Sequence, residues 1–220
     1  MHSVSRSFDR AEHVYKNEAF AELVKDAIRF FNGSPVHALP PPTRFLGTGV
    51  YALYYMGTNT HYARYAELNR LSYGYPIYVG KAVPSGWRKS RISDQPGNKK
   101  SELFRRLSEH ASNIEKGDGI ALPEFSCRFV IFEDEGSDMI STIEAALIKL
   151  NMPLWNTAVD GFGNHTPGAG RFEQAKSDWD VIHPGRDWAE KCVGHHKPKD
   201  QILKNILDHL ERFRGSNEMP

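Results

Sequence analysis

Several stretches of the chain repeat apolar residues every three or four positions, which is the pattern of an amphipathic helix. These stretches are residues 17–31, 101–116, 137–151 and 200–214. Ser101 and Ser137 are expected at the starts of the two middle helices. Residues that commonly end a helix follow each stretch, namely Asn32–Gly33, Gly117, Pro153 and Gly215. The apolar sides of the outer two helices are Phe20, Leu23, Ala27 and Phe31 in the first, and Ile202, Ile206, Leu210 and Phe213 in the last.

Three other segments, residues 49–57, 76–82 and 125–132, are rich in the β-branched and aromatic residues that favour strands. The first two follow one another with only a tyrosine-rich polar connection between them, which favours antiparallel pairing. The sequence therefore predicts an α+β fold with a small, three-stranded antiparallel sheet flanked by helices.

The spacing of these elements divides the chain into three parts. We expect an N-terminal helix and arm over 1–46, a core over 47–160 with an insertion at about 58–75, and a C-terminal extension and helix over 161–220. Within the first part, three consecutive prolines exclude a helix over 37–45 and indicate an extended segment. Residues 160–190 show no clear period.

Composition places the chain among globular proteins of ordinary charge. Its 28 basic and 27 acidic residues nearly cancel, so any nucleic-acid contact requires the basic residues to be segregated. No stretch approaches the ~18 to 20 apolar residues of a membrane helix, and the N-terminus lacks the apolar core of a secretory signal. We expect a soluble cytoplasmic protein of prokaryotic type. Cys127 reads as a core residue, and Cys192 with His195 and His196 lacks the fourth ligand of a zinc site.

Glu144 is the first residue that suggests chemistry. The helix over 137–151 gathers its apolar residues into one arc, formed by Ile140, Ile143, Leu147, Ile148 and Leu150, and Glu144 falls inside it. A carboxylate on a buried face is costly unless a metal ion or a cationic side chain compensates its charge. The residue is therefore either a metal ligand or one half of a buried salt bridge.

Arg106 and His110 lie one turn apart on the helix over 101–116, beside its apolar stripe. At the border of the core an arginine can hold a phosphate, and a histidine can move protons near neutral pH. The alternative is a solvated basic face.

Tyr51 and Tyr78 occupy equivalent places in two short strands, within Gly49-Val50-Tyr51 and Tyr78-Val79-Gly80. If these strands pair antiparallel, both phenols can lie on one face of the sheet. Gly49 and Gly80 suggest that another backbone or a ligand comes close.

These two triplets resemble the halves of the motif that names the GIY-YIG nucleases, with Val in place of Ile. The family's pattern continues with an arginine helix, a glutamate helix and an asparagine, which Arg106, Glu144 and Asn156 match in order, and His110 matches a position often used in the family. The resemblance covers about 49–160. The insertion, the terminal extensions and the segments GKAVPSGWR and DGFGNHTPGAGR are most similar to the type II restriction enzymes of the family that cut CCGCGG.

The resemblance implies hydrolysis of DNA with one Mg²⁺ per active site, for which Mn²⁺ substitutes, and no small-molecule cofactor. Glu144 would be the metal ligand, and Arg106 would stabilise the charge of the transition state. Either Tyr51 or His110 would be the general base. Tyr78 would position water or phosphate, and Asn156 would order the site through hydrogen bonds.

A basic loop at 88–100 is expected to contact DNA through phosphates. The full set of candidate DNA-binding residues is Lys81, Arg88, Lys89, Arg91, Lys99, Lys100, Arg64, Arg70, Asn164, His165 and Arg171, to which the insertion adds Tyr62 and Tyr65. A palindromic target implies a homodimer, and the two terminal helices are expected to pack within the chain or, less simply, to form part of that interface. Two other functions stay open, a nuclease of repair or mobile elements that recognises DNA structure and a nucleic-acid-binding module without catalysis.

Overall fold

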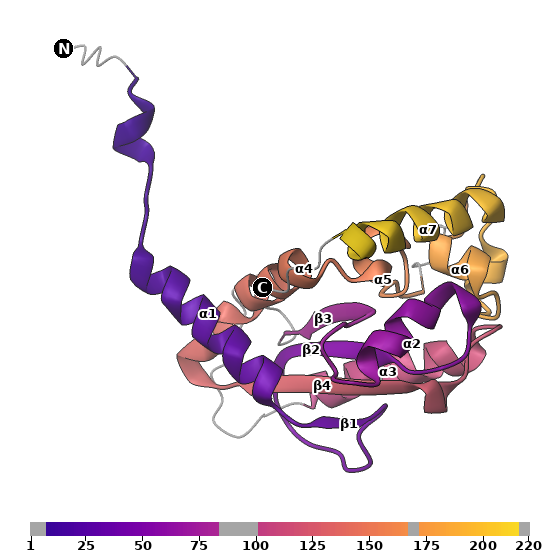
Figure 1. The fold of residues 1–220 in the computed structure, drawn as a ribbon, viewed down its shortest axis with the longest axis horizontal. Helices are drawn as coiled ribbons and strands as arrows, with labels where there is room; N and C mark the ends of the chain where they lie inside the picture. The colour runs from indigo at the N-terminus through magenta and orange to yellow at the C-terminus, as the bar shows by residue number, and fades with distance from the viewer. Residues whose placement is uncertain (1–7, 84–100, 167–171, 216–220) are drawn as a thin grey trace.

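One antiparallel sheet organises the computed structural model, which describes residues 8–83, 101–166 and 172–215 (Figure 1). Within these residues the sheet has four strands in the order β1-β4-β2-β3. The strands are β1 (Val36–Ala38), β2 (Thr48–Tyr55), β3 (Tyr78–Ala82) and β4 (Phe125–Phe132). The α+β class and the antiparallel pairing are confirmed. The expected number of three strands is wrong, because β1, which pairs with the outer side of β4, is too short to produce a pattern in the sequence.

Helices lie on both faces of the sheet. The structure has α1 (Glu18–Gly33), α2 (Ala63–Asn69), α3 (Glu102–Lys116), α4 (Ile140–Asn151), α5 (Leu154–Thr157), α6 (Asp178–Ile182) and α7 (Lys199–Gly215), with short 3-10 turns between some of them. The four helices that periodicity predicted are therefore present. The third begins at Ile140 instead of Ser137, because residues Asp134–Met139 form a 3-10 turn before it. In the described residues, no helix has both the length and the apolar character needed to cross a membrane.

Strand β2 is the centre of the core, and its alternate side chains enter two separate apolar clusters. Tyr51, Leu53 and Tyr55 pack with residues of α3, α5, α6 and α7. Val50, Ala52 and Tyr54 pack on the other face with residues of α1 and α4. Because both faces of β2 are covered, its sequence is a continuous run of apolar residues and does not alternate with polar ones.

The two terminal helices behave differently. Ile202 and Ile206 of α7 are fully buried, so this helix packs within the chain, as expected. On α1 only the C-terminal half does so, with Phe31 buried, whereas Phe20 and Leu23 are each 50% exposed. The expected packing within the chain is therefore found for the second half of α1 only, and the first half extends away from the sheet (Figure 1). The apolar arc of α4 is likewise shorter than expected, since Leu150 is exposed.

The insertion at 58–75 folds onto the end of β2. Asn69 of α2 donates to the carbonyls of Tyr55 and Tyr75, which anchors the helix there. Tyr62 and Tyr65 are buried in the core, so the expectation that they contact DNA is wrong.

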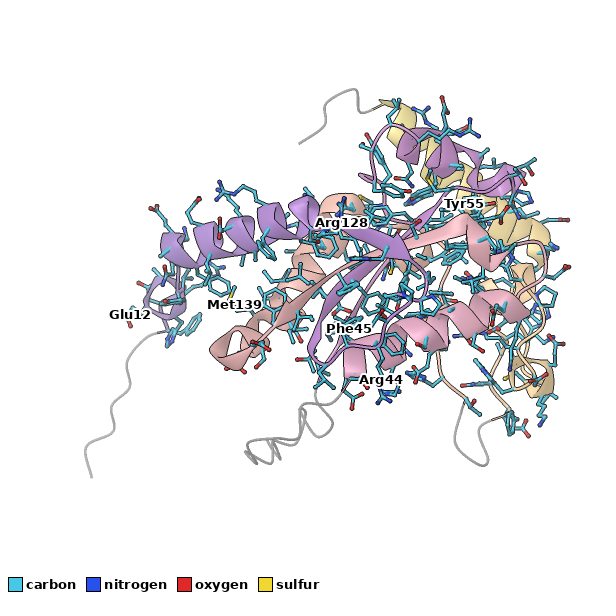
Figure 2. All side chains as sticks on the ribbon, turned by 90° about the horizontal axis from the view of Figure 1, so that it is seen from below. Glu12, Arg44, Phe45, Tyr55, Arg128 and Met139 are labelled. Carbon is cyan, nitrogen blue, oxygen red and sulfur yellow. The ribbon has the colours of Figure 1, made fainter. Side chains whose placement is uncertain are left out.

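The arm before β2 reaches the start of α3. Phe45 stacks on Phe129 of β4 at 4.6 Å, and Arg44 donates to the hydroxyl of Ser101. Figure 2 shows Arg44 and Phe45 beside α3. Ser101 does stand at the N-cap position of α3, but its side chain makes no cap hydrogen bond.

Candidate active site

The register between β2 and β3 brings the two tyrosines together. Tyr51 lies opposite Gly80, and Tyr78 lies opposite Leu53, so both side chains leave the sheet on the same face. Their ring centroids are 6.3 Å apart. This arrangement confirms the expectation drawn from the two triplets.

The glycines of the two triplets make room for close neighbours. A Cβ at Gly80 would lie 2.5 Å from the Tyr51 hydroxyl oxygen, so only glycine lets this phenol lean across β3. A Cβ at Gly49 would lie 1.9 Å from the carbonyl oxygen of Val130 in β4. The predicted approach of another backbone is confirmed at Gly49, whereas at Gly80 the close neighbour is the Tyr51 side chain and not the backbone or ligand that was expected.

His110 of α3 lies under the same phenol. Its Nε2 is 2.6 Å from the Tyr51 hydroxyl oxygen, and neither residue is exposed. Burial, followed by the charge of Arg106, holds the pKa of His110 well below its usual value of 6.5. Burial also raises the pKa of Tyr51 well above 10. Both groups are therefore neutral near pH 7, and His110 lies inside the core instead of at its border.

Arg106, one turn before His110, sits at the rim of the site with its side chain 13% exposed. Its Nη1 donates to Glu109 Oε2 at 3.1 Å and contacts His165 Nε2 at 2.7 Å. Its Nη2 donates to the carbonyl oxygen of Gly163 at 2.7 Å. The guanidinium lowers the pKa of both Tyr51 and Tyr78, against the larger effect of their burial.

The turn at 161–165 forms one wall of the site. The ring of Phe162 stacks on His110 at 4.6 Å and meets Tyr78 edge-on at 4.9 Å. At Gly163 a Cβ would lie 2.5 Å from the Tyr78 hydroxyl oxygen, so this position also excludes a side chain. In the sequence, the segment DGFGNHTPGAGR carries part of the family resemblance but indicates no role for Phe162 or Gly163.

Glu144 reaches the site from α4, on the other face of the sheet. Its Oε2 accepts a hydrogen bond from Lys81 Nζ at 2.6 Å, and the two side chains are 18% and 33% exposed. Its charge raises the pKa of Tyr51 and of Tyr78, an effect that is smaller than that of their burial. The sequence left two explanations for this carboxylate, a metal ion or a cationic side chain. The structure shows a cationic side chain, that of Lys81.

Asn156 of α5 completes the edge of β3. Its Oδ1 accepts from the backbone N–H of Val79 at 2.8 Å, and its Nδ2 donates to the carbonyl of Val79 at 2.9 Å. An edge strand has unpaired backbone groups, and this amide pairs one donor and one acceptor in place of a further strand. Figure 1 shows β3 at the edge of the sheet next to α4 and α5.

The candidate DNA-binding residues fall into three groups. Lys81, His165 and Asn164 belong to the site or to its wall, as described above. Arg64 and Arg70 lie on or beside α2, at the Tyr55 end of β2, whereas Lys81 pairs with Val50 near the other end. Outside the described residues lie Arg88, Lys89, Arg91, Lys99, Lys100 and Arg171.

An antiparallel sheet that presents Tyr51 and Tyr78 on one face, next to an arginine helix and a glutamate helix, has the arrangement of a GIY-YIG nuclease domain. The chain matches the family described as the Eco29kI GIY-YIG domain over residues 43–210, and it belongs to this family. It is therefore a DNA endonuclease of the GIY-YIG restriction type. No curated protein matches the chain.

Proposed function

We propose that this protein is a type II restriction endonuclease that hydrolyses both strands of DNA at the palindrome CCGCGG with the help of Mg²⁺. The family supports site-specific DNA cleavage, and the CCGCGG-cutting Eco29kI, for which it is named, supports the sequence of the site. The observation that carries the proposal is that two phenols and a guanidinium lie together on one face of the sheet, next to a carboxylate–ammonium pair beside β3.

Glu144 is the residue proposed to hold the metal. Carboxylate oxygens are the ligands that Mg²⁺ prefers, and the ion keeps several waters, so one carboxylate is a chemically reasonable protein ligand. The carboxylate already binds a cation, the ammonium of Lys81, in a place that solvent reaches. When bound, the metal supplies Lewis-acid stabilisation of the phosphate and of the leaving oxygen.

Tyr51 and His110 share the work of the general base in this proposal. The Tyr51 hydroxyl oxygen accepts the proton of the attacking water, and its own proton passes to His110 Nε2 at 2.6 Å. The neutral imidazole has a free lone pair for this proton when Nδ1 carries the hydrogen. A phosphate bound at Arg106 offsets the positive charge that, after burial, lowers the pKa of His110, which favours this transfer. The two residues that the sequence left as rivals for the role thus form one route for the proton.

Arg106 is proposed to stabilise the charge of the transition state. Its Nη1 is paired with Glu109 and His165, so a phosphate oxygen has to take the place of one of these partners. Because Tyr51 and His110 are fully enclosed, we expect this exchange also to open the way for water. Tyr78 then positions the phosphate or the water, and Asn156 keeps β3 in place.

DNA contacts beyond the cleaved phosphate are proposed for Lys81, Asn164 and His165, and for the basic loop at 88–100. Arginine to guanine is the commonest specific base contact, which keeps Arg64, Arg70 and Arg171 as candidates for base recognition. The division of the chain at residues 46 and 160 also stays a prediction.

A homodimer follows from the two-fold symmetry of a palindrome, because each half-site needs its own active site. The exposed apolar side chains of α1, Phe20, Leu23 and Phe30, are proposed to meet the second copy. Light scattering after size exclusion, on the wild type and on Phe20→Ser/Leu23→Ser, tests this part of the proposal, and an unchanged dimer in the variant would contradict the assignment of α1.

The proposal as a whole is tested on plasmids that carry one CCGCGG site or a scrambled site, with Mg²⁺ or with EDTA. We expect one linear product from the first plasmid with Mg²⁺ alone, and sequenced ends that lie within the site. Cutting at branched DNA only would favour the repair function, and DNA binding without cleavage under any metal would favour the binding module.

A further inference from the structure

Arg186 is a buried cation outside the residues assigned so far. Its side chain is 1% exposed and makes a two-point ion pair with Asp180, which is equally buried. Nε donates to Oδ1 at 2.6 Å, and Nη2 donates to Oδ2 at 2.7 Å. The guanidinium lies between the rings of Trp179 and Trp188, at 4.6 and 4.7 Å from their centroids.

The remaining donors of Arg186 all point at one turn of the backbone. Nη2 donates to the carbonyl of Gly161 at 3.0 Å, and Nη1 donates to those of Phe162 at 3.2 Å and Asn164 at 3.5 Å. With the two bonds to Asp180, these three bonds use the whole capacity of a guanidinium, which has five N–H donors. Removing two charges from water is costly, and the attraction within the ion pair and the five hydrogen bonds of the guanidinium offset part of that cost.

The fourth carbonyl of this turn, that of Gly163, binds a different arginine. Gly163, between the residues that Arg186 holds, accepts instead from Arg106 Nη2 at 2.7 Å. The turn is closed on itself by the N–H of Asn164, which donates to the carbonyl of Gly161 at 3.0 Å. Two arginines therefore bind the carbonyls of one turn, Arg186 from the core and Arg106 from the rim of the site.

The same turn contacts three other residues of the candidate site. It sets the Phe162 ring against His110 and Tyr78, and it brings His165 to Arg106. A displacement of about 1 Å at catalytic groups can cost 100-fold in rate. A rigid support behind the turn thus has a direct use in catalysis.

We infer that Arg186 is a positioning residue of the cleavage reaction, which fixes the 161–164 turn so that Arg106 and His110 keep their reactive geometry. The inference rests on the proposed function, because it assigns those two residues to the chemistry. It also makes a segment from beyond the motif residues part of the active site.

The test uses two variants and one control in the full-length protein. Asp180→Asn/Arg186→Met removes both charges and keeps the volume, and Arg186→Lys keeps the charge opposite Asp180 but loses the fork that reaches the carbonyls. The control is Tyr62→Phe, which removes a buried hydrogen bond to His183 in the same aromatic core. Single-turnover cleavage, DNA affinity and the ¹⁵N resonances of the Arg106 side chain are measured for each.

For both Arg186 variants we expect cleavage about 10- to 100-fold slower, DNA affinity within about threefold of the wild type, and shifted Arg106 resonances. Tyr62→Phe is expected to leave the cleavage rate and these resonances unchanged. Wild-type cleavage rates with unchanged resonances in the Arg186 variants would overturn the inference, as would loss of folding in both, since Arg186 would then serve the fold alone. If the wild type cuts no DNA, the proposed function fails, while the Arg106 resonances still decide whether Arg186 holds the turn.

Discussion

Two ion pairs support the Tyr51–Tyr78 site, and they differ in how much water reaches them. Asp180–Arg186 is closed off completely, with both side chains 1% exposed and two charge-assisted hydrogen bonds between them. Lys81–Glu144 has one contact at 2.6 Å and keeps 33% and 18% of its side chains exposed.

The degree of burial determines whether water or another ion can replace a partner of each pair. In the core no solvent is at hand to replace a lost partner, so the first pair acts as a fixed clamp. At the edge of β3 water can solvate either partner, so the ammonium on Glu144 can be exchanged for another cation. The same type of interaction is thus closed to water in one place and partly solvated in the other, where Glu144 is proposed to bind the metal.

The largest expected effect comes from breaking the closed pair on one side only. Arg186→Met leaves the carboxylate of Asp180 buried without its cation, and we expect the free energy of unfolding to fall by about 3–5 kcal/mol. Urea unfolding followed by tryptophan fluorescence measures the change. Asp180→Asn/Arg186→Met serves as the control and should recover most of the loss; a single variant within 1 kcal/mol of the wild type would contradict the clamp.

The second largest loss of stability is expected from acid, through a histidine beside Trp179. His183, whose ring lies 5.1 Å from that of Trp179, has its pKa lowered to about 4 by burial. The unfolded chain therefore binds more protons below pH 6.5, so the stability that neutral His183 contributes is present above 6.5 and is lost as the pH falls toward 4. The loss is roughly 3 kcal/mol over this window.

Urea midpoints at several pH values measure this effect in the wild type and in His183→Gln. The variant should show a flatter decline between pH 6.5 and 4, because its amide does not titrate. Parallel declines in the two proteins would show that His183 does not carry the acid sensitivity.

The open pair is probed by its affinity for metal without DNA. Lys81→Met removes the competing ammonium, and we expect Glu144 to bind Mg²⁺ or Mn²⁺ about tenfold more tightly, equivalent to ~1.4 kcal/mol. Isothermal titration calorimetry gives the dissociation constant, and Lys149→Met, on the exposed side of the same helix as Glu144, is the matched control. Equal affinity in Lys81→Met and the wild type would show that the ammonium does not occupy the metal's place.

The smallest expected effect is that of Lys81→Met on the stability of the protein. Because the Lys81–Glu144 pair is partly solvated, we expect Lys81→Met to alter the free energy of unfolding by less than about 1 kcal/mol. Urea unfolding at low and high salt checks this value. A loss as large as that of Arg186→Met would remove the distinction between the two pairs.

Much of the fold could be predicted because its elements are long and periodic. β2, β4, α3, α4 and α7 each carry enough residues for a pattern, and their order placed Tyr51 and Tyr78 on one sheet. β1, with three residues, and α6, with five, are too short to show one. Their positions depend on packing partners far away in the sequence.

The site was predictable in its residue types but less so in its contacts. Glu144 was noticed because a charge interrupts an apolar arc, yet nothing in the spacing indicates that Lys81, on a different element, neutralises it. Arg186 gave no signal, since the region from 160 to 190 lacks a period and its partners are mainly backbone carbonyls. The partner of the apolar side of α1 stayed open in the sequence, because an amphipathic pattern does not say whether that side meets this chain or another surface.

Glu144 is proposed to serve the chemistry of cleavage and not the binding of DNA. Single-turnover cleavage and fluorescence anisotropy on the same CCGCGG duplex, for the wild type and Glu144→Gln, test it most directly. We predict that the variant loses at least about 1000-fold in cleavage rate, as when a key charged group is removed from an active site, while its DNA affinity stays within about threefold. A variant that still cleaves at the wild-type rate would contradict the account.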